Sequence, residues 1–448
     1  MSNRWIDSKG LSAALVGAAV LGAGLLSVGD AGAAPGVRIG SLISNSPTDP
    51  PPTDAFCRAN FGGPCYSPQE IRNAYGLTSM IDAGYTGAGQ TIVLIESFGS
   101  PTIQADLQAF DQGYGLPDPP SLMVLAPLGT VPFDPTVSDQ VGWAAETTLD
   151  VEWAHAMAPS ASIVVMTSPI DETEGVQGMP EFLALEKYAL DHHLGHIISQ
   201  SWGATENTLF TPSGHRVFAN FTELYERARR EHVTVLASTG DFGSTNPELD
   251  LMTLYPFPVV AFPASSPLVT AVGGTSLFAD TSGSYQSETA WQAGGGGISQ
   301  FFAEPEYQEH SLPASTQAAL GGFRGIPDLS FNADGNTPIL VYLSFFGPAA
   351  AGYYSIGGTS EGSPTWAGIV ADLNQFAGHP LGFLNSKLYA LGRRGRIYDF
   401  FHDVTTGNNS IAGVPGYNAA VGWDLVTGWG TPDLTRIPSR WSELFDDE

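Results

Sequence analysis

The sequence predicts an α/β fold in which a mostly parallel central sheet is covered by helices on both faces. Short runs of β-branched and apolar residues recur along the chain, and helical stretches such as Pro180–His193 and Asn220–His232 separate them. Continuously apolar strands that alternate with helices are typical of a buried parallel sheet. The expected strands are Thr91–Glu96, Ser162–Thr167, His196–Ser201, Val233–Ser238 and Leu268–Val272.

Residues 1–34 have the pattern of a secretory signal peptide. A basic stretch precedes an Ala-, Gly- and Leu-rich apolar run at 11–28, and four small residues follow at 31–34. This order predicts export with cleavage near Ala33 or Ala34. The apolar run is also long enough for an uncleaved anchor, so attachment to the cell envelope stays open.

Residues 35–65 are expected to form a flexible leader, because residues 35–55 are rich in Pro, Ser, Thr and Gly. Cys57 and Cys65 are the only cysteines of the chain and enclose a short loop. Two sulfurs alone make a poor metal site, so in an exported chain a disulfide between them is expected. Residues 66–448 are expected to form one large domain.

The chain is strongly acidic but sparsely charged. Its 448 residues include 45 Asp and Glu against 17 Lys and Arg, which gives a formal net charge of −28 at pH 7. This balance argues against nucleic acid or an anionic membrane surface as a partner. Charged residues make up 14% of the chain, against roughly 25% in average soluble proteins. Few native ion pairs would therefore be lost in acid, although an ordinary acidic secreted protein could have the same composition.

Ser360 is the candidate nucleophile. It lies in the stretch 357–364, at a glycine-rich entry to an apolar helix. Glycine allows a sharp turn there, Pro364 is expected in the first turn of the helix, and unpaired N–H groups would stabilise developing negative charge. A serine at this place could also be an ordinary cap of a buried helix.

A carboxylate is the expected base for this serine, because none of the nine histidines has a convincing setting. Glu146 and Asp150 lie four residues apart on an expected helix, which places them on one face about 6 Å apart along the axis. Like charges so close disfavour double ionisation, so one acid should keep its proton to higher pH. A solvated helix face is the alternative, but the flanking residues are apolar and burial without a purpose would be costly.

Asp241 follows the strand 233–238 in a glycine-containing turn. A simple Asx-type turn would explain it. Because ligands collect beyond the carboxyl ends of parallel strands, a protonated Asp241 could instead donate a hydrogen bond to a tetrahedral intermediate. Only the neutral acid can donate, which again requires acidic conditions.

Taken together, these residues resemble the sedolisin family of serine-carboxyl peptidases, from about Tyr66 to near Pro432. The Ser-Gly-Thr-Ser-x-x-x-Pro signature of that family is matched by residues 357–364, with Gly in place of the first Ser. Its Glu-x-x-x-Asp pair and its Ser-x-Gly-Asp motif are matched by the acids described above. The glycine-rich stretch 294–308 is also similar to the family.

The resemblance implies a subtilisin-like α/β fold and a peptidase that acts in acid. In that scheme Ser360 is the nucleophile, Glu146 the base, Asp150 its partner and Asp241 the oxyanion donor. Glu96 and Trp202 would support the carboxyl pair, although a strand-end acid and a packed ring would look the same in the sequence.

The resemblance also implies a calcium site near the C-terminus. Asp403 and Asp424 would supply carboxylates, while Val404, Ala420 and Gly422 would supply main-chain carbonyls. Hard cations prefer such oxygen ligands. A loop rich in Gly and Asn could otherwise be plain turn structure.

One departure concerns the leader, which is expected to be too short for the folded prosegment common in the family. The mature protein is expected to be a secreted monomer that cleaves peptides or proteins, either as an endopeptidase or as a tripeptidyl-peptidase. An exported binding protein without turnover is the first alternative, by analogy of fold. A glycosidase using Glu146 and Asp150 is the second, but acids on one helix face fit opposite sides of a sugar bond poorly.

Overall fold

The computed structural model describes residues 38–44 and 50–437, and the signal-peptide prediction for residues 1–34 lies outside them. An eight-stranded sheet forms its centre, with the order β10-β9-β7-β5-β2-β4-β3 and with β13 paired beside β9. All pairs are parallel except β10 with β9. The strands are β2 (Thr91–Ser97), β3 (Leu122–Leu125), β4 (Ser162–Ser168), β5 (Ile197–Gln200), β7 (Thr234–Ser238), β9 (Thr270–Ala279), β10 (Tyr285–Ala290) and β13 (Leu329–Asn332).

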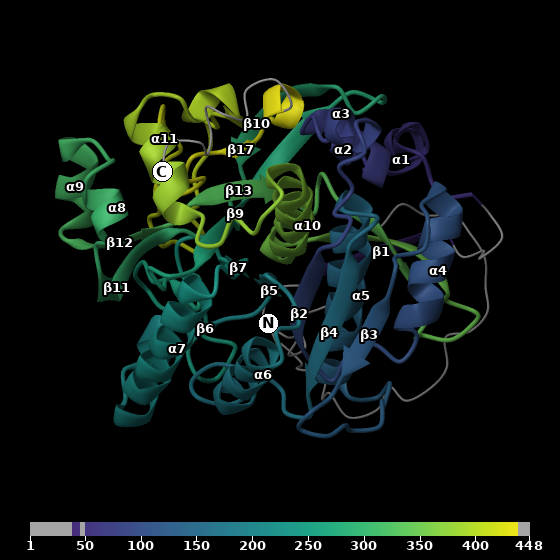
Figure 1. Ribbon diagram of the computed structural model, residues 1–448, viewed down its shortest axis with the longest axis horizontal. Helices are drawn as coiled ribbons and strands as arrows, with labels where there is room; N and C mark the ends of the chain where they lie inside the picture. Colours follow the sequence, from purple (N-terminus) through teal and green to yellow (C-terminus); the bar gives the residue numbers. More distant parts are fainter. Residues whose placement is uncertain (1–37, 45–49, 438–448) are drawn as a thin grey trace, which may run out of the picture. The chain divides into compact units, whose positions relative to one another are not determined.

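Helices cover both faces of this sheet, which confirms the predicted fold class (Figure 1). Alternate residues of β2 divide between two cores: Ile92 and Leu94 join one, and Val93 and Ile95 join the other. Successive strand side chains point to opposite faces, so a strand buried on both sides must be apolar throughout. The first core is covered by α5 (Ser138–Met157) and α10 (Thr359–Ala377), and the second by α6 (Met179–Asp191) and α7 (Pro212–Arg230).

Helices α5 and α10 approach each other closely because α10 has glycine at the contact. A Cβ atom on Gly368 would lie 2.6 Å from the Cβ of Met157 and 2.8 Å from the carbonyl oxygen of Ala154. Any larger residue would force the helices apart. This contact matters because α5 carries Glu146 and Asp150, and α10 carries Ser360.

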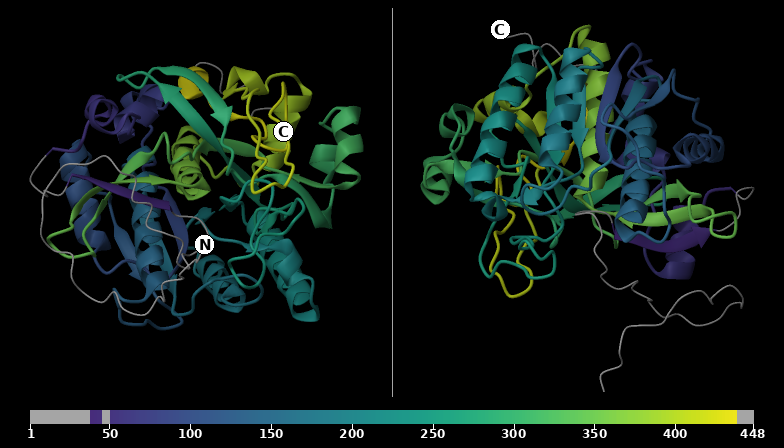
Figure 2. Two further views of the ribbon diagram at one scale, coloured as in Figure 1. Left: turned by 180° about the vertical axis from the view of Figure 1, so that it is seen from behind. Right: turned by 90° about the horizontal axis from the view of Figure 1, so that it is seen from below.

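The described part of the expected leader is structured, which corrects the prediction of flexibility there. Residues Arg38–Ser44 form β1, an antiparallel partner of β15 (Gly352–Gly357), which also pairs with β14 (Ile339–Leu343). Figure 2 shows the purple β1 running beside these green strands. Pairing with β1 gives hydrogen-bond partners to backbone groups on the free side of β15. A composition rich in Pro, Ser and Gly does not reveal this pairing.

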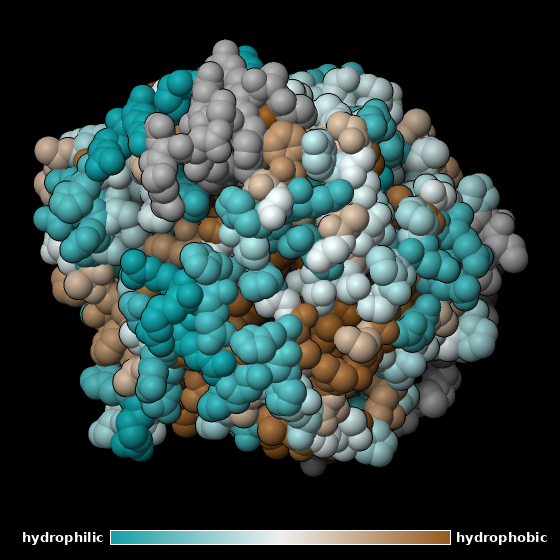
Figure 3. All heavy atoms as spheres, in the orientation of Figure 1, coloured by the Kyte–Doolittle hydropathy of each residue, from teal (hydrophilic) through white to brown (hydrophobic). Residues whose placement is uncertain are grey.

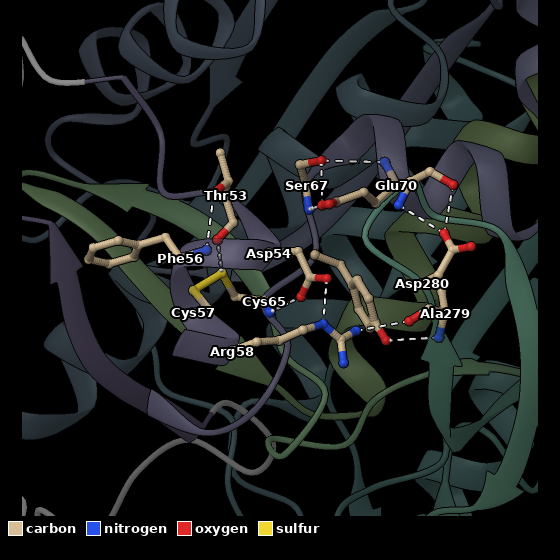
Figure 4. Close-up of polar contacts among 12 residues, drawn as sticks. Thr53, Asp54, Phe56, Cys57, Arg58, Cys65, Ser67, Glu70, Ala279 and Asp280 are labelled. Carbon is tan, nitrogen blue, oxygen red and sulfur yellow. Dashed lines mark hydrogen bonds and ion pairs between the residues drawn. A yellow bond between two sulfur atoms is a disulfide. The ribbon is translucent and has the colours of Figure 1, made fainter. Parts of the chain in front are cut away.

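Helix α1 (Asp54–Phe61) continues this structured segment. Cys57 and Cys65 are joined by a disulfide (Figure 4). Asp54 is buried beside it, where it accepts hydrogen bonds from the Cys65 N–H at 3.2 Å and from Arg58 Nε at 2.7 Å. Arg58 also donates to the carbonyl of Ala279 at the end of β9. The disulfide loop is therefore tied to the central sheet.

The remaining elements form smaller layers around this centre. The helices are α2 (Pro68–Ala74), α3 (Thr78–Asp82), α4 (Ile103–Tyr114), α8 (Glu306–Glu309), α9 (Ala314–Leu320) and α11 (Asn385–Arg393). The short strands are β6 (Ala204–Thr205), β8 (Ala261–Phe262), β11 (Gly297–Ala303), β12 (Phe323–Ile326), β16 (Phe401–His402) and β17 (Thr431–Pro432). Among the described helices, none combines the length and apolar character needed to cross a bilayer. On the face drawn in Figure 3, hydrophilic residues predominate.

Candidate active site

Ser360 lies in the first turn of α10, directly after β15 ends. Gly358 caps the helix with φ 142°, a conformation that favours glycine. The Ser360 side chain is almost completely buried. Pro364 is the sixth residue of α10, so it lies beyond the first turn, where it was expected. Because proline has no N–H, the helix leaves the Ser360 carbonyl without its usual donor, and Ser201 Oγ lies 3.4 Å from that oxygen.

Glu146 and Asp150 are buried on α5, which excludes the solvated helix face considered above. Burial raises the pKa of Glu146 well above its ordinary value, the charge of Asp150 raises it further, and the Ser360 hydroxyl lowers it. No hydrogen bond of full geometry joins the Ser360 hydroxyl to the Glu146 carboxyl. Such bonds are often long in ligand-free enzymes and shorten when substrate binds.

Asp150 is held by a serine from a neighbouring strand end. Ser201 follows β5, and its Oγ lies 3.0 and 2.9 Å from the two carboxylate oxygens of Asp150. Burial raises the pKa of Asp150, while hydrogen bonds from Ser201, Glu96 and Glu146 lower it. Negative charge in this cluster therefore settles first on Asp150, and the two glutamates keep their protons to higher pH.

Glu96 joins the carboxyl pair from the end of β2. Its side chain is fully buried, and Thr147 Oγ1 lies 3.4 Å from its Oε2. Burial raises its pKa well above the ordinary value, and the charges of Asp150 and Glu146 add to this increase. Trp202 is buried against Phe182, with ring centroids 4.6 Å apart, and its indole N–H makes no hydrogen bond among the described residues. The structure therefore brings Glu96 to the pair, while Trp202 contributes packing.

Asp241 is tied to the residue before the candidate nucleophile. Its Oδ1 accepts hydrogen bonds from the Thr359 N–H at 2.8 Å and from Thr359 Oγ1 at 2.9 Å. The same Oγ1 accepts from the Gly240 N–H at 3.0 Å. These bonds hold the end of β7 against the start of α10, so the Asp241 carboxyl lies beside the turn that presents Ser360.

A small pocket with a volume of about 20 Å³ lies beside Asp241. Its walls combine apolar and polar groups: Glu174, Trp202, Gly203, Ser238, Gly240, Asp241, Phe242, Asn246, Pro247 and Ala261. A cavity of this size holds about one water molecule.

The five residues expected to bind calcium lie on two segments that contact each other. Asp403 Oδ2 accepts a hydrogen bond from the Gly422 N–H at 3.1 Å, and Asp424 Oδ2 accepts from the Ala420 N–H at 2.8 Å. Burial raises the pKa of both aspartates, that of Asp424 to about 6. In the described ranges, no three His, Cys, Asp or Glu side chains form a metal-binding group. A cation would therefore depend on two carboxylates plus carbonyls such as that of Val404, a donor set that suits Ca²⁺.

Sequence reasoning did not single out Ser201 and Thr359 as individual contributors. Ser201 appeared only as the end of an expected strand, and Thr359 only within the signature at 357–364. Their role depends on which side chains the strand ends bring together. The usable signal was their position, since both follow the end of a buried strand.

Comparisons with known proteins find relatives over most of this chain. Residues 139–385 match the subtilase family. Kumamolisin from Bacillus sp. is 36% identical over 382 residues, which cover 83% of this chain and 63% of kumamolisin. Human tripeptidyl-peptidase 1 is 30% identical over 400 residues, with the same two coverages of 83% and 63%. The chain thus spans less than two thirds of these curated relatives.

Among solved structures, the chain is similar to Pseudomonas sedolisin, described as a serine-carboxyl proteinase in complex with pseudo-iodotyrostatin. The TM-score is 0.69 at 26% identity, and the match covers 86% of this chain and 100% of that one. Both the identity and the overlap are high enough for the likeness to extend beyond the general fold.

Proposed function

Because the chain belongs to the subtilase family, on its sedolisin branch, we propose that it is an exported serine-carboxyl peptidase that hydrolyses peptide bonds in acid. The observation that carries the proposal is the contact of Ser201 with both buried Asp150 and Ser360. Its Oγ lies 3.0 and 2.9 Å from the carboxylate oxygens of Asp150 and 3.4 Å from the Ser360 carbonyl oxygen. A buried carboxyl with a raised pKa can exchange protons with a serine in acid, where histidine would already be charged.

The proposed reaction begins with attack of Ser360 Oγ on the scissile carbonyl carbon. Glu146 passes its own proton to the ionised Asp150 as it takes the hydroxyl proton, and a proton later returns through Glu146 to the leaving amine. Ser201 supports this step because it fixes the carboxylate of Asp150. Asp241 and backbone N–H groups near Ser360 would stabilise the negative oxygen of the tetrahedral intermediate.

A calcium ion is proposed between the segments that carry Asp403 and Asp424, with carbonyls of Val404, Ala420 and Gly422 completing its shell. Asp424 is buried and Asp403 is half-buried, and their raised pKa values reflect a desolvation cost that a cation would offset. The ion would stabilise the fold and take no part in the chemical step.

The two alternatives have less support. A binding protein without turnover would need none of the four groups that meet around Ser360. A glycosidase would need carboxyls on opposite sides of a sugar bond, whereas Glu146 and Asp150 share one helix face and belong to one proton-sharing cluster. Export is proposed from the pattern of residues 1–34.

The proposal is tested with purified protein and casein at about pH 4, beside the matched Ser360→Ala variant. We expect cleavage by the unaltered protein and a loss of at least about 10³-fold in the variant. Equal cleavage by both proteins would exclude Ser360 as the nucleophile. Mass spectrometry of the products then separates endopeptidase cleavage from release of N-terminal tripeptides.

A further inference from the structure

Glu361, the residue after the candidate nucleophile, is a buried acid that the proposed reaction does not use. Its side chain has no exposed surface, although it directly follows Ser360 in the first turn of α10. Its Oε1 accepts a hydrogen bond from Asn332 Nδ2 at 3.0 Å, and its Oε2 has no partner among the described residues. Burial of this carboxyl group costs free energy, which points to a structural role for its hydrogen bond with Asn332.

The partner of Glu361 is held rigidly at the end of β13. Asn332 Oδ1 accepts hydrogen bonds from the Leu277 N–H at 3.0 Å and from Thr337 Oγ1 at 2.8 Å. Its Nδ2 donates to the carbonyl of Thr337 at 2.8 Å and to Glu361. Both lone-pair directions of the oxygen and both N–H groups of the amide are therefore in use, so Asn332 offers Glu361 a fixed donor.

The network continues away from the site through a tyrosine. The Asn332 N–H donates to Tyr75 Oη at 3.2 Å, and Tyr75 Oη donates to Glu288 Oε1 at 2.7 Å. Glu288 also accepts from Thr275 Oγ1 at 2.7 Å and from Thr431 Oγ1. The chain of bonds therefore links the first turn of α10 to strands β9, β10, β13 and β17 (Figure 1).

The residues on both sides of Ser360 are thus anchored by hydrogen bonds. Thr359 is bound to Asp241 on β7's carboxyl edge, and Glu361 is bound to Asn332 on β13. We propose that Glu361 is a positioning residue, which as a neutral carboxylic acid fixes the first turn of α10 and thereby the Ser360 hydroxyl. This proposal rests on the proposed function of Ser360.

The surroundings of Glu361 favour the neutral form. The titratable groups that face it are Asp334, from the turn after β13, and Tyr75, behind which lies Glu288. All of them are acids. Burial raises the pKa of Glu361 well above its ordinary value, the hydrogen bond from Asn332 lowers it, and Asp334 raises it. An ionised Glu361 would have to leave this site or draw in water, and either change would loosen the turn.

Two substitutions separate the hydrogen bond from the charge. Glu361→Gln keeps an oxygen acceptor for Asn332 but cannot ionise, whereas Glu361→Leu keeps similar volume and removes the acceptor. Glu186→Gln is the matched control, because Glu186 is also fully buried but lies on α6, across the central sheet from α10. Each protein is compared for kcat and KM on a peptide substrate, for melting temperature and for amide hydrogen exchange.

At about pH 4 we expect Glu361→Gln to keep kcat within about threefold, and Glu361→Leu to lose at least about tenfold in kcat with KM unchanged. Hydrogen exchange at residues 358–363 should increase in the leucine variant and not in the glutamine variant. As the pH rises above the acidic optimum and through the raised pKa of Glu361, kcat of the glutamine variant should fall less steeply than that of the unaltered protein. The Glu186→Gln variant should match the unaltered protein in kcat at about pH 4, in hydrogen exchange at residues 358–363 and in the decline of kcat with pH.

A folded Glu361→Leu protein with unchanged kcat and unchanged exchange would overturn the positioning role. An identical decline of kcat with pH in the glutamine variant and the unaltered protein would overturn the requirement for the neutral acid. Failure of the proposed function looks different, because then the unaltered protein itself does not cleave peptides. The exchange measurement still tests the anchoring in that event, since it needs no substrate.

Discussion

Ser201 joins the carboxyl pair to the candidate nucleophile, because its Oγ lies 3.0 and 2.9 Å from the carboxylate oxygens of Asp150 and 3.4 Å from the carbonyl oxygen of Ser360. These three residues come from the end of β5, from α5 and from α10. A single hydroxyl proton cannot serve both partners fully, and the shorter contacts show that it serves the carboxylate. Ser201 therefore favours the ionised form of Asp150.

Ser201→Ala is expected to reduce kcat by about 10- to 100-fold, which corresponds to the loss of a hydrogen bond to a charged group. Since Ser201 lowers the pKa of Asp150, the acidic limb of the pH–kcat profile should also move to higher pH. Ser199→Ala is the control: Ser199 is buried on β5 and bonds to Ser363 Oγ at 2.8 Å instead. Equal effects of the two substitutions on the pH profile would contradict a specific role for Ser201.

Asp241→Ala is expected to lower kcat by about 10²- to 10³-fold, as the loss of one oxyanion donor does in other peptidases. The substitution also removes the acceptor of the two Thr359 bonds. Asp241→Asn separates these effects, because it keeps an acceptor for Thr359 and a neutral donor at every pH. We expect the asparagine variant to retain more activity than the alanine variant and to lose less of it toward neutral pH, as measured by initial rates of peptide cleavage. If the asparagine variant were as inactive as the alanine variant at acidic pH, donation by this side chain would not explain the site.

The sequence predicted the sheet better than the site, and the reason is physical. Strands buried on both faces must be apolar throughout, so β2, β4 and β5 are visible in the sequence itself. The link from Glu361 to Asn332 joins residues 29 positions apart, and the Ser201 bond to Asp150 joins residues 51 positions apart. Neither has a local pattern, since each depends on which strand ends become neighbours in the folded sheet.

Two errors of the sequence interpretation have the same origin. Pro364 was expected in the first turn of α10, but the helix already begins at Thr359, which is bound to Asp241, so Pro364 is its sixth residue. The segment 38–44 was expected to be flexible, yet it pairs with β15. Composition describes what a segment would do alone, whereas both outcomes depend on a partner distant in the sequence.

Removal of calcium is expected to lower the melting temperature of the protein without changing the residues that meet at Ser360. The reason is that half-buried Asp403 and buried Asp424 would then have no cation between their segments to offset their desolvation. A chelator titration followed by thermal unfolding measures the change. Asp424→Asn should abolish the calcium-dependent part, and Asp118→Asn, at an exposed position, should leave it intact. A melting temperature that does not respond to added Ca²⁺ in the unaltered protein would refute the site.

The stability of the folded protein is expected to decrease as the pH rises from about 4.5 to above 7, and Glu288 supplies a test of the cause. Burial raises the pKa of Glu288 from 4.5 to about 7, against hydrogen bonds from Thr431, Thr275 and Tyr75 that lower it. The folded state therefore holds a proton that the unfolded chain releases at lower pH. Such a group stabilises the fold fully below its unfolded pKa, and this contribution is lost as the pH rises through the folded pKa.

A shift of this size corresponds to about 3 kcal/mol of unfolding free energy from this one group. Urea unfolding at several pH values measures how steeply the unfolding free energy falls with pH. Glu288→Gln should make this slope shallower between about pH 4.5 and 7, because the amide cannot ionise. Glu223→Gln, at an exposed position of α7, should leave the slope as it is. The midpoint of the glutamine variant at a single pH is not informative, since an amide cannot replace every bond that Glu288 accepts. The difference in this slope between the glutamine variant and the unaltered protein depends only on the proton that Glu288 holds in the folded state. An unchanged slope in the glutamine variant would show that Glu288 has the same pKa in the folded and unfolded chain.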